Sequence, residues 1–154
     1  MSFSFWHSRL DVEPLKVSAI GLEVLVRLPP SASGGELAII ETRNEPGFGP
    51  PLHRHRETEI FRVLEGRYLF EVDGKRFHAE AGDVVSVPGG AVHTFVNVAA
   101  TPSRQLVIFS PGLDATAFFA DLAAATRDGI DKAALDRFGE KWSIEFLGPP
   151  LKAE

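Results

Sequence analysis

The sequence predicts an all-β protein with one or two helices near its C-terminal end, and three observations support this class. Between Val17 and Ser110, short apolar runs alternate with Gly, Pro and Asp turn signals, as in proteins built from many short strands. Asp73-Gly74 lies between two runs of alternating apolar and polar residues, which is a strong hairpin signal. Helical spacing of apolar residues begins only after Ser110.

The first third of the chain is expected to hold short strands separated by irregular segments. Pro and Gly clusters mark the loops, and runs of Val, Ile and Leu mark the strands. In chain order we expect an arm at 3–14, one or two strands at 17–28, a loop at 29–35, a strand at 36–42 and a loop at 43–51.

The clearest single element is a hairpin that pairs residues 68–72 with 75–79. The Asp73-Gly74 dipeptide between them favours a type I′ turn, whose twist suits paired strands. Alternation directs the aromatic side chains of the first strand to the interior and His78 to solvent.

Two helices are predicted after the strands. Asp114 is a suitable N-cap for a helix to about Arg127, and Asp131 for a shorter helix that ends at Gly139. Their apolar stripes are typical of packing against a core rather than of a cofactor site. We expect three further strands, at 84–87, 105–110 and 142–147.

Three histidines and a glutamate form a candidate metal site. His53 and His55 stand at i and i+2, so on a strand they point to one face. A straight strand would place Glu59 about 13 Å beyond His55, so we expect the chain to bend at 56–58. His93 follows a Pro-Gly-Gly turn in a distant segment. Three imidazoles and a carboxylate suit one divalent transition metal, such as Fe, Mn, Ni, Co, Cu or Zn, and leave coordination positions open.

The two segments that carry these residues resemble the paired signature motifs of the cupin superfamily. The first motif, Gly, five residues, His-x-His, three residues, Glu, six residues, Gly, is met at Gly47, His53, His55, Glu59 and Gly66. The second motif, Gly, five residues, Pro-x-Gly, two residues, His, three residues, Asn, is met at Gly82, Pro88, Gly90, His93 and Asn97. More loosely, Phe109-Ser-Pro-Gly112 before a helix and the segment from Trp142 to Pro150 are similar to small single-domain cupins of the quercetin dioxygenase-like kind.

The resemblance implies an antiparallel jelly-roll barrel that encloses a metal held by the same four residues. We therefore expect a single cupin domain over residues 1–154, with a barrel core at about 17–110. One or two helices and a strand, at about 111–150, would pack outside the barrel. The family implies no single activity, because cupins include enzymes, ligand-binding regulators and storage proteins.

The pocket around the metal is expected to be mainly apolar. We predict that it is lined by Phe61, Val63, Tyr68, Phe70, Phe95 and Asn97. For Asn97, completing a turn is the favoured role over contacting a ligand. Glu59 would act both as ligand and as proton acceptor, as the resemblance suggests.

These expectations favour an enzyme, a metal-dependent dioxygenase for a small enolizable or aromatic hydroxy-ketone. One alternative is a metal-dependent isomerase or lyase of a sugar or keto acid. Another is a non-enzymatic cupin that binds a small ligand.

The composition of the chain limits the partners, the chemistry and the cellular location that we expect for this protein. The 154 residues have a net charge of −5 with mixed signs and no basic patch, so a nucleic-acid partner is not expected. The lack of Cys removes thiolate chemistry. No apolar run approaches 18 residues and the start lacks a signal-peptide pattern, so we expect a cytoplasmic protein without a membrane partner. By analogy with other cupins, a homodimer is expected.

Overall fold

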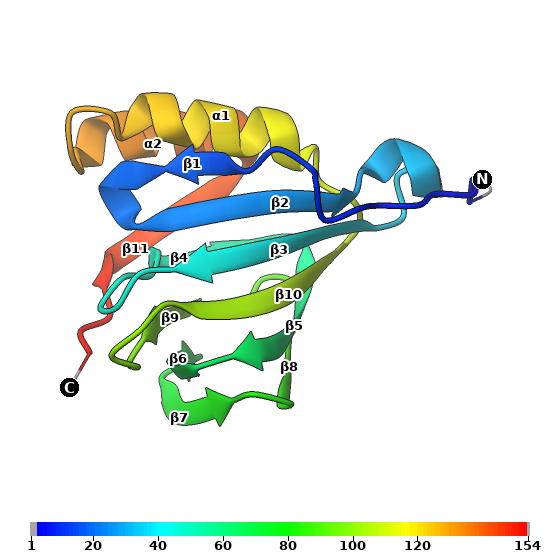
Figure 1. Ribbon diagram of the computed structural model, residues 1–154. Helices are drawn as coiled ribbons and strands as arrows, with labels where there is room; N and C mark the ends of the chain where they lie inside the picture. Colours follow the sequence, from blue (N-terminus) through cyan, green and yellow to red (C-terminus); the bar gives the residue numbers. More distant parts are fainter. Residues whose placement is uncertain (1–2, 154) are drawn as a thin grey trace.

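The computed structural model describes residues 3–153 and contains two antiparallel sheets and two helices (Figure 1). The six-stranded sheet consists, in spatial order, of β1 (Leu15–Val17), β2 (Leu22–Leu28), β3 (Ala38–Asn44), β10 (Ser103–Ser110), β5 (Thr58–Glu65) and β8 (Val84–Val87). The five-stranded sheet consists of β11 (Ile144–Pro150), β4 (Pro51–His55), β9 (His93–Asn97), β6 (Arg67–Val72) and β7 (Lys75–Glu80). Two short 3-10 helices, Ser18–Ile20 and Pro30–Ser33, interrupt the first strands.

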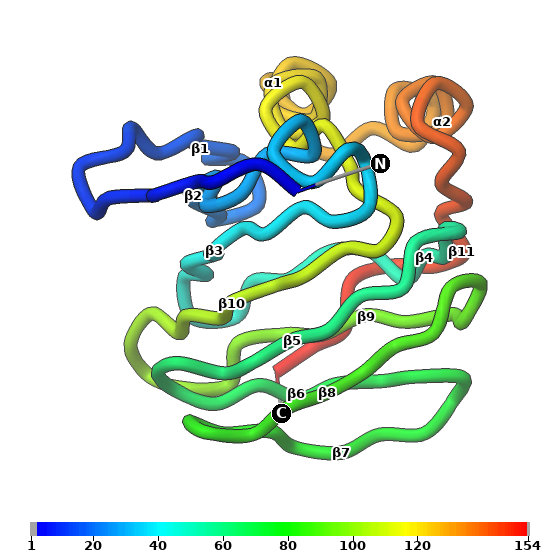
Figure 2. Tube along the Cα trace, turned by 90° about the vertical axis from the view of Figure 1, so that its right-hand side faces the viewer, coloured from blue at the N-terminus to red at the C-terminus, as the bar shows by residue number. Residues whose placement is uncertain are grey.

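The two sheets face one another and enclose the interior of the protein (Figure 2). No strand is shared and no ladder joins the sheets among residues 3–153, so they do not close into a single barrel. The predicted mostly antiparallel β fold is therefore confirmed, whereas the closed barrel is not. The chain crosses from one sheet to the other between β4 and β5, and this crossing shapes the site described below.

The hydrophobic core lies between the sheets and follows the expected alternation. In β10, the sequence left the interior face open because Leu106 to Phe109 are all apolar. The structure decides this point, since Val107 and Phe109 are buried while Leu106 and Ile108 are only half-buried. The same period of two holds in β3, where every second residue from Ala38 is buried.

The predicted hairpin is confirmed with its turn type. Strands β6 and β7 pair with Phe70 opposite Phe77. Asp73 and Gly74 have φ angles of 47° and 81°, and a type I′ turn requires positive φ at both positions. His78 is exposed on β7, as alternation predicts.

The helices α1 (Ala115–Ala125) and α2 (Lys132–Trp142) lie across one end of the two sheets (Figure 2). Helix α1 contacts β1 and β2 of the six-stranded sheet, and α2 contacts β11 of the five-stranded sheet. Both predicted N-caps are confirmed, because Asp114 accepts from the Ala117 N–H at 3.2 Å and Asp131 from the Ala134 N–H at 3.1 Å. Neither helix has the length and apolar character needed to cross a bilayer.

The predicted end of α2 at Gly139 is wrong. The helix continues to Trp142 and ends at Ser143, which has a φ of 59°, so β11 begins at Ile144 rather than near Trp142. Gly139 serves another purpose inside the helix. A Cβ at this position would collide with the Ile144 carbonyl, so glycine allows β11 to return close to the helix.

Candidate metal centre

Two elements of one sheet and one of the other bring the four candidate ligands together. His53 on β4 and His93 on β9 are direct partners in the five-stranded sheet, and His55 follows two residues later on the same strand. The predicted bend is confirmed at Arg56 and Glu57. Because the chain crosses there to β5, Glu59 faces the three histidines from the opposite sheet.

The turn before His93 is attached to this bend. The Gly90 N–H donates to the His55 carbonyl at 2.7 Å, and the Gly89 N–H donates to Thr58 Oγ1 at 3.1 Å. A Cβ at Gly89 would collide with the Arg56 carbonyl, which explains glycine at this point. These two hydrogen bonds hold the two motifs together and so fix the directions of the ligand side chains.

The four side chains form a compact buried cluster that could hold a metal ion. One ligating atom from each of His53, His55, Glu59 and His93 lies within 4.8 Å of all the others. Glu59 Oε1 is 2.6 Å from His55 Nε2 and 3.1 Å from His93 Nε2. The structure thus brings together all four residues that the sequence singled out.

Hydrogen bonds outside the cluster orient two of the imidazoles. The Nδ1–H of His53 donates to the Pro51 carbonyl at 2.7 Å, and that of His93 to the Ala91 carbonyl at 2.9 Å. In this tautomer, assigned from the hydrogen bonds, each Nε2 carries a lone pair. The lone pair of His93 then meets the Glu59 oxygen, also an acceptor, at 3.1 Å. Two acceptors at this distance require a cation or a proton between them, so the residues fit a metal ion.

The charge states also suit a metal. Burial, reinforced by repulsion from His93 when that ring is protonated, lowers the pKa of His53 to about 3, so this imidazole is neutral at pH 7. Burial alone would raise the pKa of Glu59. Without a metal, protonated His55 and His93 donate hydrogen bonds to this carboxylate, which outweigh burial and hold that pKa well below its usual range. Imidazole and ionised carboxylate are together suitable ligands for a divalent transition metal.

Glu57 was missed as a site residue because it lies in the predicted bend. Its carboxylate is buried and its Oε1 lies 3.5 Å from Nδ1 of His55, an atom without a hydrogen-bond partner in the part of the chain that the structure describes. Burial lowers the pKa of His55, but the hydrogen bond and charge of Glu59 and the charge of Glu57 outweigh this, so the pKa is raised. The signal that could have found Glu57 is strand alternation, because residues 53, 55, 57 and 59 are every second residue and would point to the same face of a strand.

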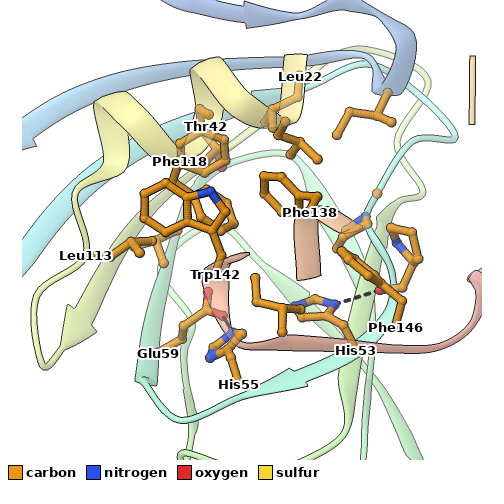
Figure 3. A pocket seen from close by; sticks show the side chains of 18 of the residues that line it. Leu22, Thr42, His53, His55, Glu59, Leu113, Phe118, Phe138, Trp142 and Phe146 are labelled. Carbon is orange, nitrogen blue, oxygen red and sulfur yellow. Dashed lines mark hydrogen bonds and ion pairs between the residues drawn. The ribbon is translucent and has the colours of Figure 1, made fainter. Parts of the chain in front are cut away.

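A cavity of about 130 Å³ adjoins the cluster and lies between the sheets and the helices (Figure 3). At about 30 Å³ per water molecule, this volume corresponds to about four water molecules. Its sheet wall is formed by residues such as Ile40, Thr42, Asn44, Phe61, Phe95 and Val107. The opposite wall comes from the helices and their connections and includes Leu113, Phe118, Leu122, Leu135, Phe138 and Trp142. No Lys or Arg is among the described residues that line it.

Only part of the predicted pocket lining contacts this cavity. Phe61 and Phe95 line it, whereas Val63, Tyr68 and Phe70 do not. These three are buried where the interior is filled, and Phe70 packs against Phe61 and Phe95 with ring centroids 5.2 and 5.5 Å apart. The predicted inward direction of these three side chains is correct, but they do not contact the cavity.

Asn97 also lies outside the cavity. Its Nδ2 donates to the carbonyls of Asn44 and Thr101 at 3.0 and 2.9 Å. Its Oδ1 accepts from the Ala99 N–H at 2.9 Å and from Ser103 Oγ at 2.7 Å. These bonds hold the connection between β9 and β10, which is the turn-completing role that the sequence favoured.

The helices contribute more than the core packing expected of them. Phe119 and Leu135 are buried against the rest of the protein. However, Phe118, Phe138 and Trp142 also line the cavity, and Phe118 contacts the other two with ring centroids 5.0 and 5.3 Å away. The helices therefore form one wall of the candidate site instead of lying only outside it.

Sequence comparison identifies the central part of the chain. Residues 41–109 match the cupin domain family. An uncharacterized protein of Methanocaldococcus jannaschii is 33% identical over 61 residues, which are 39% of this chain and 49% of that protein. The match thus spans about half the length of this curated relative.

Solved structures support the same assignment. An RmlC-like cupin from Shewanella frigidimarina is 25% identical with a TM-score of 0.61, covering 74% of this chain and 94% of that one. A predicted oxalate decarboxylase from Thermotoga maritima is 24% identical with a TM-score of 0.65, covering 69% and 99%. A sugar phosphate isomerase of the cupin superfamily from Silicibacter pomeroyi is 27% identical with a TM-score of 0.52, covering 71% and 68%. Residues 41–109 therefore match the cupin domain family, and the chain has the cupin fold.

Proposed function

We propose that this chain binds one divalent transition metal through His53, His55, Glu59 and His93 and acts as a dioxygenase on a small enolizable or aromatic hydroxy-ketone. The observation that carries this proposal is the position of the cluster. Four buried nitrogen and oxygen ligands lie beside a cavity whose other walls are mainly apolar and lack Lys and Arg among the described residues.

The cavity wall favours a neutral substrate. When bound, the metal would supply a Lewis acid that polarises a substrate oxygen. A phosphate or a remote carboxylate placed among Phe61, Phe95 and Phe118 would lose hydration without gaining a cationic side chain. A ketone with an adjacent hydroxyl or enol brings its oxygen atoms to the cluster and its carbon skeleton to the apolar wall.

Glu59 is suited to accept the substrate proton. Its Oε1 already contacts His55 and His93, whereas Oε2 has no hydrogen-bond donor among residues 3–153. The lowered pKa keeps the carboxylate ionised before the substrate arrives. We assign Oε2 as the atom that takes up the proton of the substrate hydroxyl. Both atoms of O₂ would enter the product, so the reaction needs no additional reductant.

Anaerobic loading with Fe, Mn, Ni or Co, followed by O₂-uptake assays on 1,3-diketones and flavonols, tests the proposal. We expect substrate-dependent O₂ consumption with at least one metal and none with the metal-free protein. The His93→Ala variant serves as the matched control without an intact ligand set. Absence of O₂ consumption with every metal would contradict dioxygenase activity.

The likeness to the sugar phosphate isomerase favours one alternative, a metal-dependent isomerase or lyase of a sugar or keto acid. Turnover of such compounds without O₂ would support this alternative. The lack of a cationic side chain among the described lining residues counts against phosphorylated substrates. Tight binding of a small ligand without turnover would instead support a non-enzymatic role.

The expected homodimer stays a prediction. It is supported by the N-terminal arm, whose large apolar side chains are more than half exposed at Phe3, Phe5, Trp6 and Leu10. Light scattering across a range of protein concentrations measures the mass directly. A monomer at all concentrations would contradict the prediction.

A further inference from the structure

We propose that Thr42 provides a second polar contact for the ligand at the end of the cavity remote from Glu59. The cavity would then select an elongated ligand that has an oxygen function near each end and an apolar middle. The inference rests on the proposed function for the end of the ligand that binds the metal. It adds a residue outside the metal cluster that would determine which ligands bind.

The hydroxyl of Thr42 lacks a partner. Thr42 belongs to the interior face of β3, lines the cavity and is 7% exposed. Its Oγ1 is buried and makes no hydrogen bond within the described chain. Leaving a buried hydroxyl unpaired costs about 1–3 kcal/mol, a cost that a valine of similar shape would not carry. The polar atom is therefore suited to a partner that the chain itself does not supply.

Two neighbouring polar side chains occupy the same part of the interior. Gln105 on β10 is the direct partner of Thr42 in the sheet and is fully buried. Neither of its amide atoms has a hydrogen-bond partner among residues 3–153. Asn44 stands two residues after Thr42 on the same face and also lines the cavity. Its Oδ1 accepts from the Tyr68 hydroxyl at 2.9 Å, which orients the amide. Thr42 thus belongs to a polar group within an otherwise apolar wall.

The sheet register shows that this group is far from the metal cluster. Thr42 lies opposite Gln105, which lies opposite Val63, whereas Glu59 lies opposite Phe109. Along the strand direction, the rows that hold Thr42 and Glu59 are four residues apart, or about 13 Å. Across the sheet, the two residues lie two strands apart, or about 10 Å. Figure 3 shows Thr42 on the other side of the cavity from Glu59.

An apolar strip separates the two polar ends. Ile40, Val107 and Phe61 form one row across β3, β10 and β5, midway between the rows of Thr42 and Glu59, and all three line the cavity. With these separations, the Cα atoms of Thr42 and Glu59 are about 16 Å apart. Because both side chains point into the cavity, they would contact ligand oxygens that are on the order of 10 Å apart. An aromatic ring with a para-hydroxyl and a diketone has this form.

A matched pair of probes tests the inference on the Co²⁺-loaded full chain. The probes are 1-phenylbutane-1,3-dione and its 4-hydroxyphenyl analogue, and the visible spectrum of cobalt reports binding at the metal. We expect the wild type to bind the hydroxylated probe on the order of 5- to 10-fold more tightly, as one hydrogen bond would give. In Thr42→Val this ratio should fall to about 1, and in Thr42→Ser it should be retained.

A stability measurement separates a ligand contact from a structural role. Since Oγ1 has no hydrogen-bond partner among the described residues, Thr42→Val should leave the melting temperature of the metal-free protein unchanged or raise it. A lower melting temperature, or the same probe ratio in wild type and Thr42→Val, would overturn the inference and leave the proposed function standing. If neither probe altered the cobalt spectrum, the proposed function and this inference would both be wrong.

Discussion

The sheet wall and the helical wall of the cavity are built in different ways. On the sheet wall, three of the candidate ligands lie on adjacent β4 and β9, and the fourth lies just after the crossing to β5. Backbone hydrogen bonds such as Gly90 N–H to His55 O hold these strands in place. The helical wall consists of large apolar side chains from α1, from α2 and from the residues next to these helices.

This difference has a physical basis. Metal coordination depends on direction and distance, so its ligands are best placed on paired strands. Apolar contact is non-directional, and helices can supply it without fixed backbone partners in the sheets. We therefore expect changes on the sheet wall to alter metal affinity, and changes on the helical wall to alter stability and ligand shape. The following variants test this division.

The largest effect is expected from removing a ligand. In His93→Ala, the cluster loses one nitrogen donor, so the affinity for Co²⁺ or Zn²⁺ should fall by more than about 100-fold. Isothermal titration measures the affinity, and circular dichroism checks that the fold remains. The control is His78→Ala, since this exposed histidine on β7 should not affect metal binding. Wild-type affinity in His93→Ala would contradict the assigned site.

On the helical wall, Phe118→Ala should mainly reduce stability. The Phe118 ring contacts Phe119, Phe138 and Trp142 with centroid distances of 4.9, 5.0 and 5.3 Å. Because the side chain is only partly buried, we expect a loss of about 2 kcal/mol, below the range for fully buried phenylalanines. Urea unfolding measures this loss. A large fall in metal affinity in the still-folded variant would contradict the expectation that the helical wall does not determine metal binding.

A smaller effect on metal affinity is expected from Glu57→Gln. The Glu57 carboxylate lies 3.5 Å from Nδ1 of His55 and would hold that ring toward the metal. Removing its charge should weaken metal binding by about 10-fold. Arg56→Gln is the matched control, because Arg56 is exposed and contacts the same carboxylate at 3.7 Å. Equal affinity in Glu57→Gln and wild type would show that Glu57 does not position His55.

The smallest effect concerns the contact between the helices. Hydrogen bonds from Lys141 and Trp142, at 2.7 and 2.9 Å, lower the pKa of Asp121 below its ordinary value. A lowered folded-state pKa stabilises the protein above the unfolded-state pKa, and this contribution is lost as pH falls through the folded-state value. Asp121→Asn should therefore melt slightly below wild type at pH 7, with a smaller difference at pH 3. A difference that grew on acidification would contradict this assignment.

Much of the candidate site could be predicted because its signals are local. The i, i+2 spacing of His53 and His55, the need for a bend before Glu59, and the turn before His93 all follow from the geometry of single strands and turns. The two N-caps and the Asp73-Gly74 turn were predictable for the same reason. In each case, a few adjacent residues determine the backbone conformation.

Other features depend on which parts of the interior are filled. Alternation correctly directed Tyr68 and Phe70 inward, but it does not show that their rings pack against one another away from the cavity. Nor does it show that Gly139 lies within α2, where it admits the returning strand. Glu57 and Thr42 became visible only when their surroundings showed a buried carboxylate and a hydroxyl without a partner.

The sequence alone determined the strands, the caps, the hairpin turn and the set of four candidate ligands, because each rests on spacing within a short segment. Tertiary structure decided that the sheets stay separate, that the helices form a wall of the cavity, and that polar groups lie at both of its ends. These features arise from contacts between residues far apart in the chain. Periodicity distinguishes inside from outside, but only packing determines where the inside remains open.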